Sequence, residues 1–212
     1  MDFDVLIQQP EAKRDNAWEQ AFLNAFAGMK VQLDSDQAKT GPDGFPYFFV
    51  RTSPDAKESV RDLVLWLAPR GIGMVVNAHK MLPDYIFPNG MLWNFVETGR
   101  YLADGETQRT GDAVYQDGRK LIMGPPSDKY LPPYVRAVLR EFLAAQGFAQ
   151  PKILVISTPD YKQIDLMIST ESLNNIEKKS QRMLADRLAW FLPLHYTLVL
   201  GSEQGFPPFH PL

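Results

Sequence analysis

Apolar positions recur along the chain with the periods of helices and strands. Trp18, Phe22 and Phe26 follow one another every four residues, so they line one face of a helix expected over Asn16–Ala27. Such an aromatic stripe is typical of a buried helix face. The polar stretch Asp34–Gly44 is rich in turn-forming residues and predicts a loop.

A crossover unit is predicted next. Phe45–Arg51 is a short aromatic run that predicts a strand, and Gly73–Asn77 is an apolar run typical of a strand buried on both faces. Between them, Ser53 as N-cap and Pro54 at the first helical position predict a helix start. A strand, a helix and a strand in this order place the two strands parallel.

The middle of the chain is less periodic. The segment Met91–Leu102 fits either a short helix or a strand, and Ala113–Met123 predicts a hairpin that turns at Asp117–Gly118. The run Gly124–Ser127 is typical of a linker. A boundary between two subdomains is therefore expected after Pro126.

The second half repeats the alternation of helices and strands. The expected elements are a helix over Pro132–Gln146, strands over Lys152–Ser157 and Gln163–Ser169 that pair as a hairpin, a long helix over Leu173–Phe191 capped by Ser172, and a strand over His195–Leu200. Within Gln163–Ser169, Ile164, Leu166 and Ile168 alternate with Asp165 and Met167, which predicts a strand with one face exposed to solvent.

Together these elements predict an α/β fold, with α+β as the alternative, built from two small sheet-and-helix subdomains with mixed sheets. The N-terminal subdomain is expected over residues 1–126 with the hairpin as an insert, and the C-terminal one over residues 127–212.

Composition narrows the classes of function. The chain of 212 residues has no cysteine, which excludes disulfides, thiolate catalysis and cysteine-bound metal. A formal net charge of −3 does not favour binding to nucleic acid or to an anionic membrane, because both partners are negatively charged. No apolar run approaches the roughly 20 residues of a membrane helix, and the first residues do not resemble a signal peptide. We therefore expect a cytoplasmic protein without nucleic-acid or membrane partners.

The candidate site follows the strand Gly73–Asn77. Polar side chains just beyond the carboxyl end of a parallel strand project into the crevice where α/β sheets bind ligands. The expected binding residues there and in the following aromatic stretch are Asn77, His79, Lys80, Asp84, Tyr85 and Trp93. Tyr85, Phe87 and Trp93 lie near a turn, so we expect exposed aromatic side chains of the kind that suits a protein interface.

No catalytic residue is assigned from the sequence. Gly71 and Gly73 lie between a helix and the body of a strand, whereas a phosphate-binding loop follows a strand and opens a helix, so they indicate a helix stop. His79, with Asp84 to orient it, fits a general base, yet no Gly-x-Ser-x-Gly nucleophile motif accompanies it. The three histidines lie far apart, so neither a metal nor a cofactor is expected.

Two further segments have simpler interpretations. The basic stretch Lys178–Arg187 contains acidic residues and lacks aromatics for base stacking, which favours a solvated helix face. The apolar, proline-rich segment Phe206–Pro211 fits packing on its own domain, completing a dimer or binding a partner. Packing on its own domain is favoured, because an apolar chain end is costly to leave in water.

The order of elements resembles a known family. The segments WEQAFLNAF, FPYFFVRTS, VRDLVLWLAP and GIGMVVNAH in the first half, and KILVIS, QIDLMIS and HYTLVL in the second, are similar to the SseB (enhanced serine sensitivity) family. The chain departs from that pattern in a long insert from about Pro83 to Met123 and in the loop Asp34–Gly44. The resemblance implies a small cytoplasmic bacterial α/β protein with an accessory or interaction role, and the family has no established catalytic residues to carry over to this chain.

Three functional hypotheses follow. The leading one is a non-enzymatic binding or accessory protein that contacts a protein partner through Asn77–Tyr85, the aromatic middle or the terminal segment. The alternative is a small hydrolase with His79 as general base and Asp84 as its orienting group. The third is a self-associating structural protein, so a homo-oligomer is left open.

Overall fold

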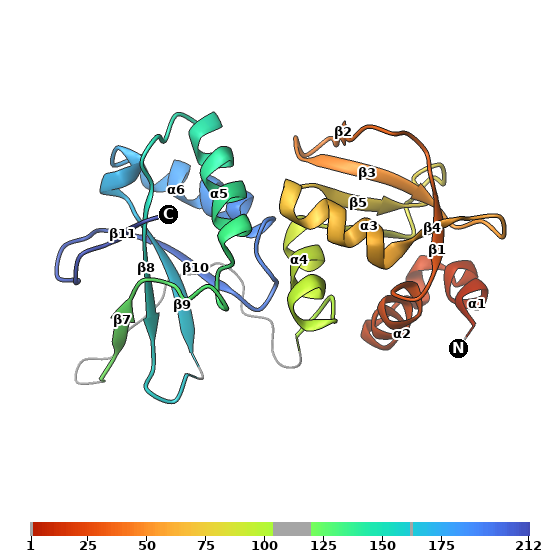
Figure 1. Cartoon of the computed structure of the whole chain (residues 1–212), viewed down its shortest axis with the longest axis horizontal. Helices are drawn as coiled ribbons and strands as arrows, with labels where there is room; N and C mark the ends of the chain where they lie inside the picture. Colours follow the sequence, from red (N-terminus) through yellow and green to blue (C-terminus); the bar gives the residue numbers. More distant parts are fainter. Residues whose placement is uncertain (1, 104–119, 162) are drawn as a thin grey trace. The chain divides into compact units, whose positions relative to one another are not determined.

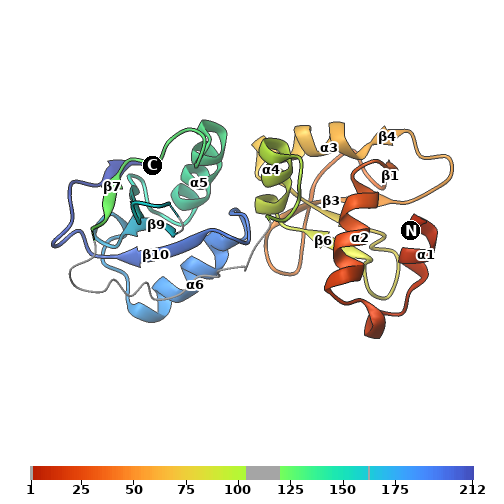
Figure 2. The ribbon, with the colours of Figure 1, turned by 90° about the horizontal axis from the view of Figure 1, so that it is seen from below.

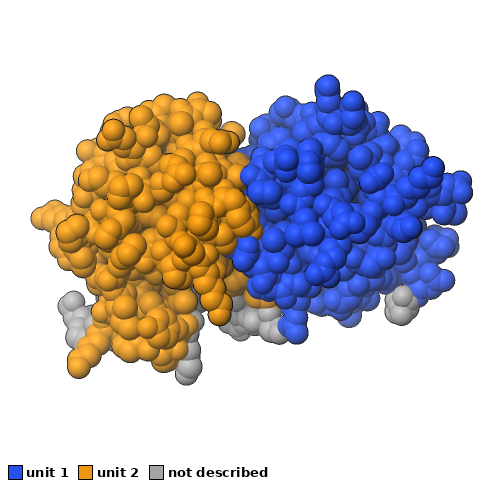
Figure 3. Space-filling view, viewed as in Figure 1, with its two compact units in different colours: residues 1–102 blue, residues 103–212 orange. Residues whose placement is uncertain are grey.

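The computed structural model describes residues 2–103, 120–161 and 163–212 (Figures 1 and 2). It has the expected α/β fold of two sheet-and-helix units with mixed sheets, Met1–Leu102 and Ala103–Leu212 (Figure 3). The division between the units precedes the boundary expected after Pro126. Strand β7 (Ile122–Gly124) pairs with β8 (Lys152–Ser157), so this segment belongs to the second sheet.

The first unit is built around a sheet with the strand order β4-β1-β3-β5-β6, and β2 pairs with β3 (Figure 1; β6 is labelled in Figure 2). Its elements are α1 (Phe3–Gln8), η1 (Glu11–Lys13), α2 (Asn16–Phe26), β1 (Lys30–Leu33), β2 (Lys39–Thr40), β3 (Pro46–Arg51), β4 (Glu58–Ser59), α3 (Val60–Leu67), η2 (Ala68–Arg70), β5 (Gly73–Val76), β6 (Tyr85–Phe87) and α4 (Asn89–Thr98). Strands β3 and β5 are parallel, which confirms the predicted crossover.

The aromatic face of α2 forms the core of this unit, as its period predicted. Phe22 stacks on Tyr85 with ring centroids 5.2 Å apart, and Phe26 stacks on Phe87 at 5.3 Å. Tyr85 and Phe87 lie two residues apart on β6, so both rings are on one face of the sheet. Each fully buried side chain of this size contributes about 1.5–3 kcal/mol to stability.

The predicted start of α3 was wrong. The helix begins at Val60, and its N-cap is Ser59, whose Oγ accepts a hydrogen bond from the Asp62 amide at 3.4 Å. Ser53 instead begins a turn that the Ala56 amide closes on its carbonyl oxygen at 3.1 Å. Glu58 and Ser59 pair with β1 and stay extended, so this pairing delays the helix.

Two expectations concern the middle of the chain. The segment that fitted a helix or a strand is helix α4, which ends where Gly99 takes a φ of +76°. The turn predicted at Asp117–Gly118 lies outside the described residues, as does the first strand of that hairpin.

The second unit has the strand order β10-β9-β8-β11, with β7 also paired to β8. Its remaining elements are α5 (Pro133–Ala145), β9 (Ile164–Ser169), η3 (Glu171–Leu173), α6 (Lys178–Ala189), β10 (Thr197–Gly201) and β11 (His210–Pro211). Strands β8 and β9 form the predicted antiparallel hairpin, and α5 has the predicted extent to within one residue at each end.

Two details of this half differ from the sequence prediction. The long helix begins only at Lys178, because Asn174 and Asn175 have positive φ angles of 58° and 51° and interrupt it. Ser172 therefore lies in η3 and does not cap α6. Strand β9 has no wet face, since Asp165 and Met167 are both buried.

The terminal segment packs on its own unit, as favoured from its apolar character. Strand β11 pairs with β8 through His210 and Ile153. Phe209 is buried against a cluster from the sheet, and Phe206 packs at its border; the cluster comprises Leu154, Ile156 and Met167. This segment therefore covers apolar side chains that the second sheet would otherwise expose.

Candidate functional site

Asn77 joins the ends of the two parallel strands β3 and β5. It is buried and has a φ of +56°, a left-handed conformation that asparagine tolerates better than most residues. Its Oδ1 accepts from the Thr52 amide at 2.9 Å, and its Nδ2 donates to Thr52 Oγ1 at 2.8 Å and to Asp84 Oδ2 at 2.7 Å. The carboxamide thus links the exit of β3 to the residue that precedes β6.

Asp84 has charged or polar partners on both carboxylate oxygens. Oδ1 pairs with Arg14 Nη2 at 3.0 Å, and Oδ2 accepts from Lys80 Nζ at 2.5 Å as well as from Asn77. Burial by itself raises the pKa of this carboxyl, but the hydrogen bonds from Lys80, Asn77 and Arg14 outweigh burial and lower the pKa. Asp84 is therefore a carboxylate at neutral pH. We call Arg14, Asn77, Lys80 and Asp84 the Asp84 cluster.

Arg14 ties the N-terminal segment to this cluster. Its guanidinium donates to the carbonyl oxygens of Gln9, Ile7 and Asp84 at 3.0, 3.3 and 3.2 Å. It also lies 4.6 Å from the centre of the Trp18 ring. A planar donor with five N–H groups suits this position between several acceptors. Arg14 was not among the residues singled out from the sequence, where nothing local connects it to Asp84.

The remaining predicted residues lie in different surroundings. Tyr85 donates its hydroxyl to Glu19 Oε1 at 2.6 Å, and burial together with Glu19 raises the tyrosine pKa. Trp93 is only 2% exposed and Phe87 is fully buried, so the expectation that they form an exposed aromatic surface was wrong. Both belong to the core, because α4 and α2 pack against the sheet. His79 is exposed.

Among the described residues, His79 and Asp84 do not form the pair that the hydrolase alternative requires. In residues 2–103, no hydrogen bond or ion pair joins His79 to Asp84, whose partners are the other members of its cluster. A carboxylate held by two cations and an amide is a structural anchor and not a group that orients a base. Nor do the described residues contain a group of three or more histidine, aspartate or glutamate side chains able to hold a metal ion.

The connection between β5 and β6 exposes apolar side chains. Met81 is 98% exposed and Leu82 is 56% exposed, and we call residues 79–83 the Met81 loop. The Lys80 amide closes a turn on the Asn77 carbonyl oxygen at 3.1 Å, and the Asp84 amide donates to the Val76 carbonyl oxygen at 2.9 Å. The Asp84 cluster thus fixes both ends of a loop whose tip is apolar.

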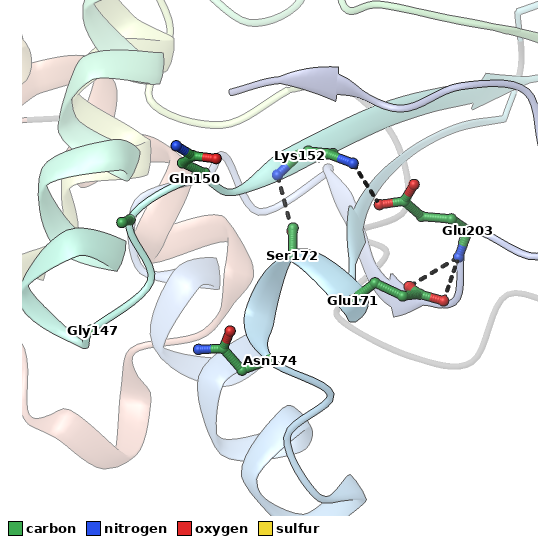
Figure 4. Close-up of a pocket in the computed structure, with 8 residues that line it drawn as sticks. Gly147, Gln150, Lys152, Glu171, Ser172, Asn174 and Glu203 are labelled. Atoms are coloured by element: carbon green, nitrogen blue, oxygen red, sulfur yellow. Dashed lines mark hydrogen bonds and ion pairs between the residues drawn. The ribbon is translucent and has the colours of Figure 1, made fainter.

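A polar pocket of about 410 Å³ lies in the second unit (Figure 4). It is formed by the end of α5, the start of β8, η3 and the turn after β10, and its lining residues are Gly147, Ala149, Gln150, Lys152, Glu171, Ser172, Asn174 and Glu203. Sequence reasoning missed this pocket, because its charged residues come from separate segments. Lys152 and Glu203 are 51 residues apart, and no local spacing connects them.

Two carboxylates and one ammonium give the pocket its charge. Glu171 accepts from Ser202 Oγ at 2.5 Å and from the Glu203 amide at 3.0 and 3.1 Å. These bonds, that from Ser202 first, lower the Glu171 pKa to about 2. Glu203 Oε1 accepts from Ser169 Oγ at 2.6 Å and from Lys152 Nζ at 3.3 Å. The same bonds hold the turn that leads from β10 into the terminal segment.

Comparison of the chain with protein-family models, with curated proteins and with solved structures gave no match in any of the three. The resemblance to the SseB family therefore stays a prediction. Within the described residues, no helix has the length and apolar character needed to cross a membrane.

Proposed function

We propose that this protein is a non-enzymatic binding or accessory protein that contacts a protein partner through the Met81 loop. The observation that supports this proposal is the exposure of Met81 and Leu82 at the tip of a loop that the Asp84 cluster holds at both ends. Exposed apolar residues that neighbour one another on a loop with both ends held by hydrogen bonds indicate a binding surface more than isolated ones do.

The chemistry of the loop suits a protein interface. Methionine is enriched in interfaces, because its flexible thioether adapts to the shape of a partner. A loop that is ordered before binding loses less conformational entropy when the complex forms. The cluster that fixes the loop therefore contributes to affinity without touching the partner.

The SseB resemblance supports the same role. What it implies is an accessory or interaction protein of the bacterial cytoplasm, and a protein partner agrees with the loop described above. We therefore include a cytoplasmic location in the proposal. No observation on residues 2–103, 120–161 or 163–212 favours the hydrolase alternative over it.

The experiment compares the Met81 loop with an exposed methionine elsewhere on the protein. A partner is isolated by affinity capture from the source cells and identified, and its affinity for purified variants is then measured by calorimetry. The double variant Met81→Ser, Leu82→Ser should bind at least tenfold more weakly, because each apolar side chain contributes roughly 1–2 kcal/mol when buried. The control is Met183→Ser, which alters an exposed methionine on α6.

All of these side chains are exposed, so the melting temperatures of the variants should match that of the wild type. The proposal fails if no protein binds stably, or if the loop variant binds as tightly as the Met183 control.

A further inference from the structure

The pocket of the second unit contains charged groups with unused hydrogen-bonding capacity. The Lys152 ammonium has three N–H donors, and one of them is used by Glu203. Within the described part of the chain, Glu203 Oε1 takes both hydrogen bonds of that carboxylate, so Oε2 accepts none. An unused cationic donor and an unused anionic acceptor therefore lie side by side at one wall of the pocket (Figure 4).

Ser172 and Glu171 also line the pocket, but their side chains already make hydrogen bonds to neighbouring groups. Ser172 Oγ accepts from the Lys152 amide at 3.0 Å and donates to the Ser169 carbonyl oxygen at 2.8 Å. Both oxygens of Glu171 accept hydrogen bonds from neutral donors, and no cation pairs with this carboxylate among the described residues. Glu171 thus adds negative charge beside the ion pair, while its lone pairs are occupied.

The carboxamides of Gln150 and Asn174 complete the lining. In Figure 4 they lie on one side of Ser172, and the Lys152–Glu203 pair lies on the other. Neither carboxamide has a hydrogen-bond partner among the described residues, so each offers a donor and an acceptor. None of the described residues that line the pocket is aromatic, which disfavours a planar or largely apolar ligand.

This arrangement selects among classes of ligand by charge. A simple cation is attracted by the two carboxylates but leaves the spare donors of Lys152 unused, and a simple anion pairs with Lys152 but is repelled by Glu171 and Glu203. A neutral polyol leaves the charged groups without a charged partner. A molecule with an ammonium and a carboxylate meets both the free acceptor and the free donors.

We propose that this pocket binds a small zwitterion with a primary ammonium group, of the size of a free amino acid or dipeptide. The ligand ammonium donates to Glu203 Oε2, and its carboxylate accepts from Lys152 Nζ. The carboxamides of Gln150 and Asn174 bind the polar groups between the two charged ends. A volume of about 410 Å³ has room for such a molecule. The site is in the second unit, so this proposal and that for the Met81 loop stand or fall separately.

Glycylglycine is a suitable probe, because two close analogues each lack one of its charges. N-acetylglycine retains only the carboxylate, and glycinamide retains only the ammonium. In a titration followed by amide NMR, glycylglycine should shift the signals of Gly147, Lys152 and Asn174 in a saturable way. Both analogues should need at least tenfold higher concentrations for half-saturation. The absence of saturable shifts, or equal binding of either analogue, would overturn the proposal.

Two variants assign the contacts. Glu203→Gln and Lys152→Met should each raise the dissociation constant for glycylglycine at least tenfold. Lys179→Met, which alters an exposed lysine on α6, should leave it unchanged. Glu203→Gln keeps a side-chain oxygen that accepts from Ser169, and its amide still donates to Glu171. This variant therefore tests the ammonium contact even if Lys152→Met fails to fold. Wild-type affinity in Glu203→Gln would refute the assignment.

Discussion

Arg14 and Asp84 are 70 residues apart in the sequence, and their side chains meet with Nη2 and Oδ1 3.0 Å apart. The Arg14 side chain is 16% exposed and that of Asp84 only 1% exposed, so most of this ion pair is shielded from solvent. Removing one partner of a shielded pair costs far more than losing an exposed one, because it leaves a charge without compensation. The pair therefore links the N-terminal segment to the Met81 loop.

Replacing the carboxylate tests this link. Asp84→Asn should lower the free energy of unfolding by about 2–4 kcal/mol, because Arg14 and Lys80 lose their counter-charge while both retain some contact with solvent. Urea unfolding at pH 7 measures the change. The control Asp55→Asn alters an exposed carboxylate and should stay within about 0.5 kcal/mol of the wild type. Equal stability of the two variants would show that the cluster is not an anchor.

Stability should depend on pH through the same carboxylate. The folded-state pKa of Asp84 is lowered below its ordinary value of 3.8, so the unfolded chain takes up its proton first as the pH falls. The stabilisation is complete above the unfolded-state pKa and is lost as the pH falls through the folded-state pKa. Melting temperatures of the wild type should therefore fall below about pH 4, and those of Asp84→Asn should fall less steeply. Parallel curves for the two proteins would contradict this account.

Glu171 makes a second contribution to the pH dependence of stability, and it can be measured separately from that of Asp84. Its pKa is lowered from 4.5 to about 2, so its stabilisation is present above pH 4.5 and is lost toward pH 2. Glu171→Gln should flatten the acid limb of the stability curve and loosen the turn at Ser202–Glu203. The effect should be smaller than that of Asp84, because this carboxylate is exposed and screened by solvent. Hydrogen exchange at the Glu203 amide reports the turn directly.

The burial of Trp93 predicts where an alanine substitution acts. Trp93→Ala should cost about 3–5 kcal/mol of folding free energy, because it empties a core position on α4. Trp66→Ala on α3 should cost less, since this side chain is 41% exposed. Urea unfolding of both variants provides the comparison. A mild effect of Trp93→Ala would place that ring outside the core.

Gly41 is expected to tolerate no side chain. A Cβ there would lie 2.8 and 2.9 Å from two carbons of the Tyr47 ring, which is buried. Gly41→Ala should therefore cost about 1–3 kcal/mol through overpacking. The control Gly28→Ala places its Cβ 3.9 Å from the nearest atom and should be neutral or slightly stabilising. Thermal unfolding distinguishes the two, and similar melting temperatures would argue against the packing at Tyr47.

The sequence revealed those features that depend on neighbours along the chain. The aromatic face of α2 and the parallel strands β3 and β5 could be predicted because periodicity shows which side of an element faces the core. Asn77, Lys80 and Asp84 could be grouped because they follow one strand within eight residues. The role of that group was not visible, since its anchor Arg14 precedes the strand by a long stretch of chain.

By itself, then, the sequence determined the type and order of most elements and the place of one polar group. Tertiary structure decided that α3 starts after Ser59, because β1 holds Glu58 and Ser59 extended. It also decided that Trp93 is core and that Lys152, Glu171 and Glu203 share a pocket. Local propensities are small compared with the free energy of burial and pairing between distant segments, so those contacts override local signals wherever the two disagree.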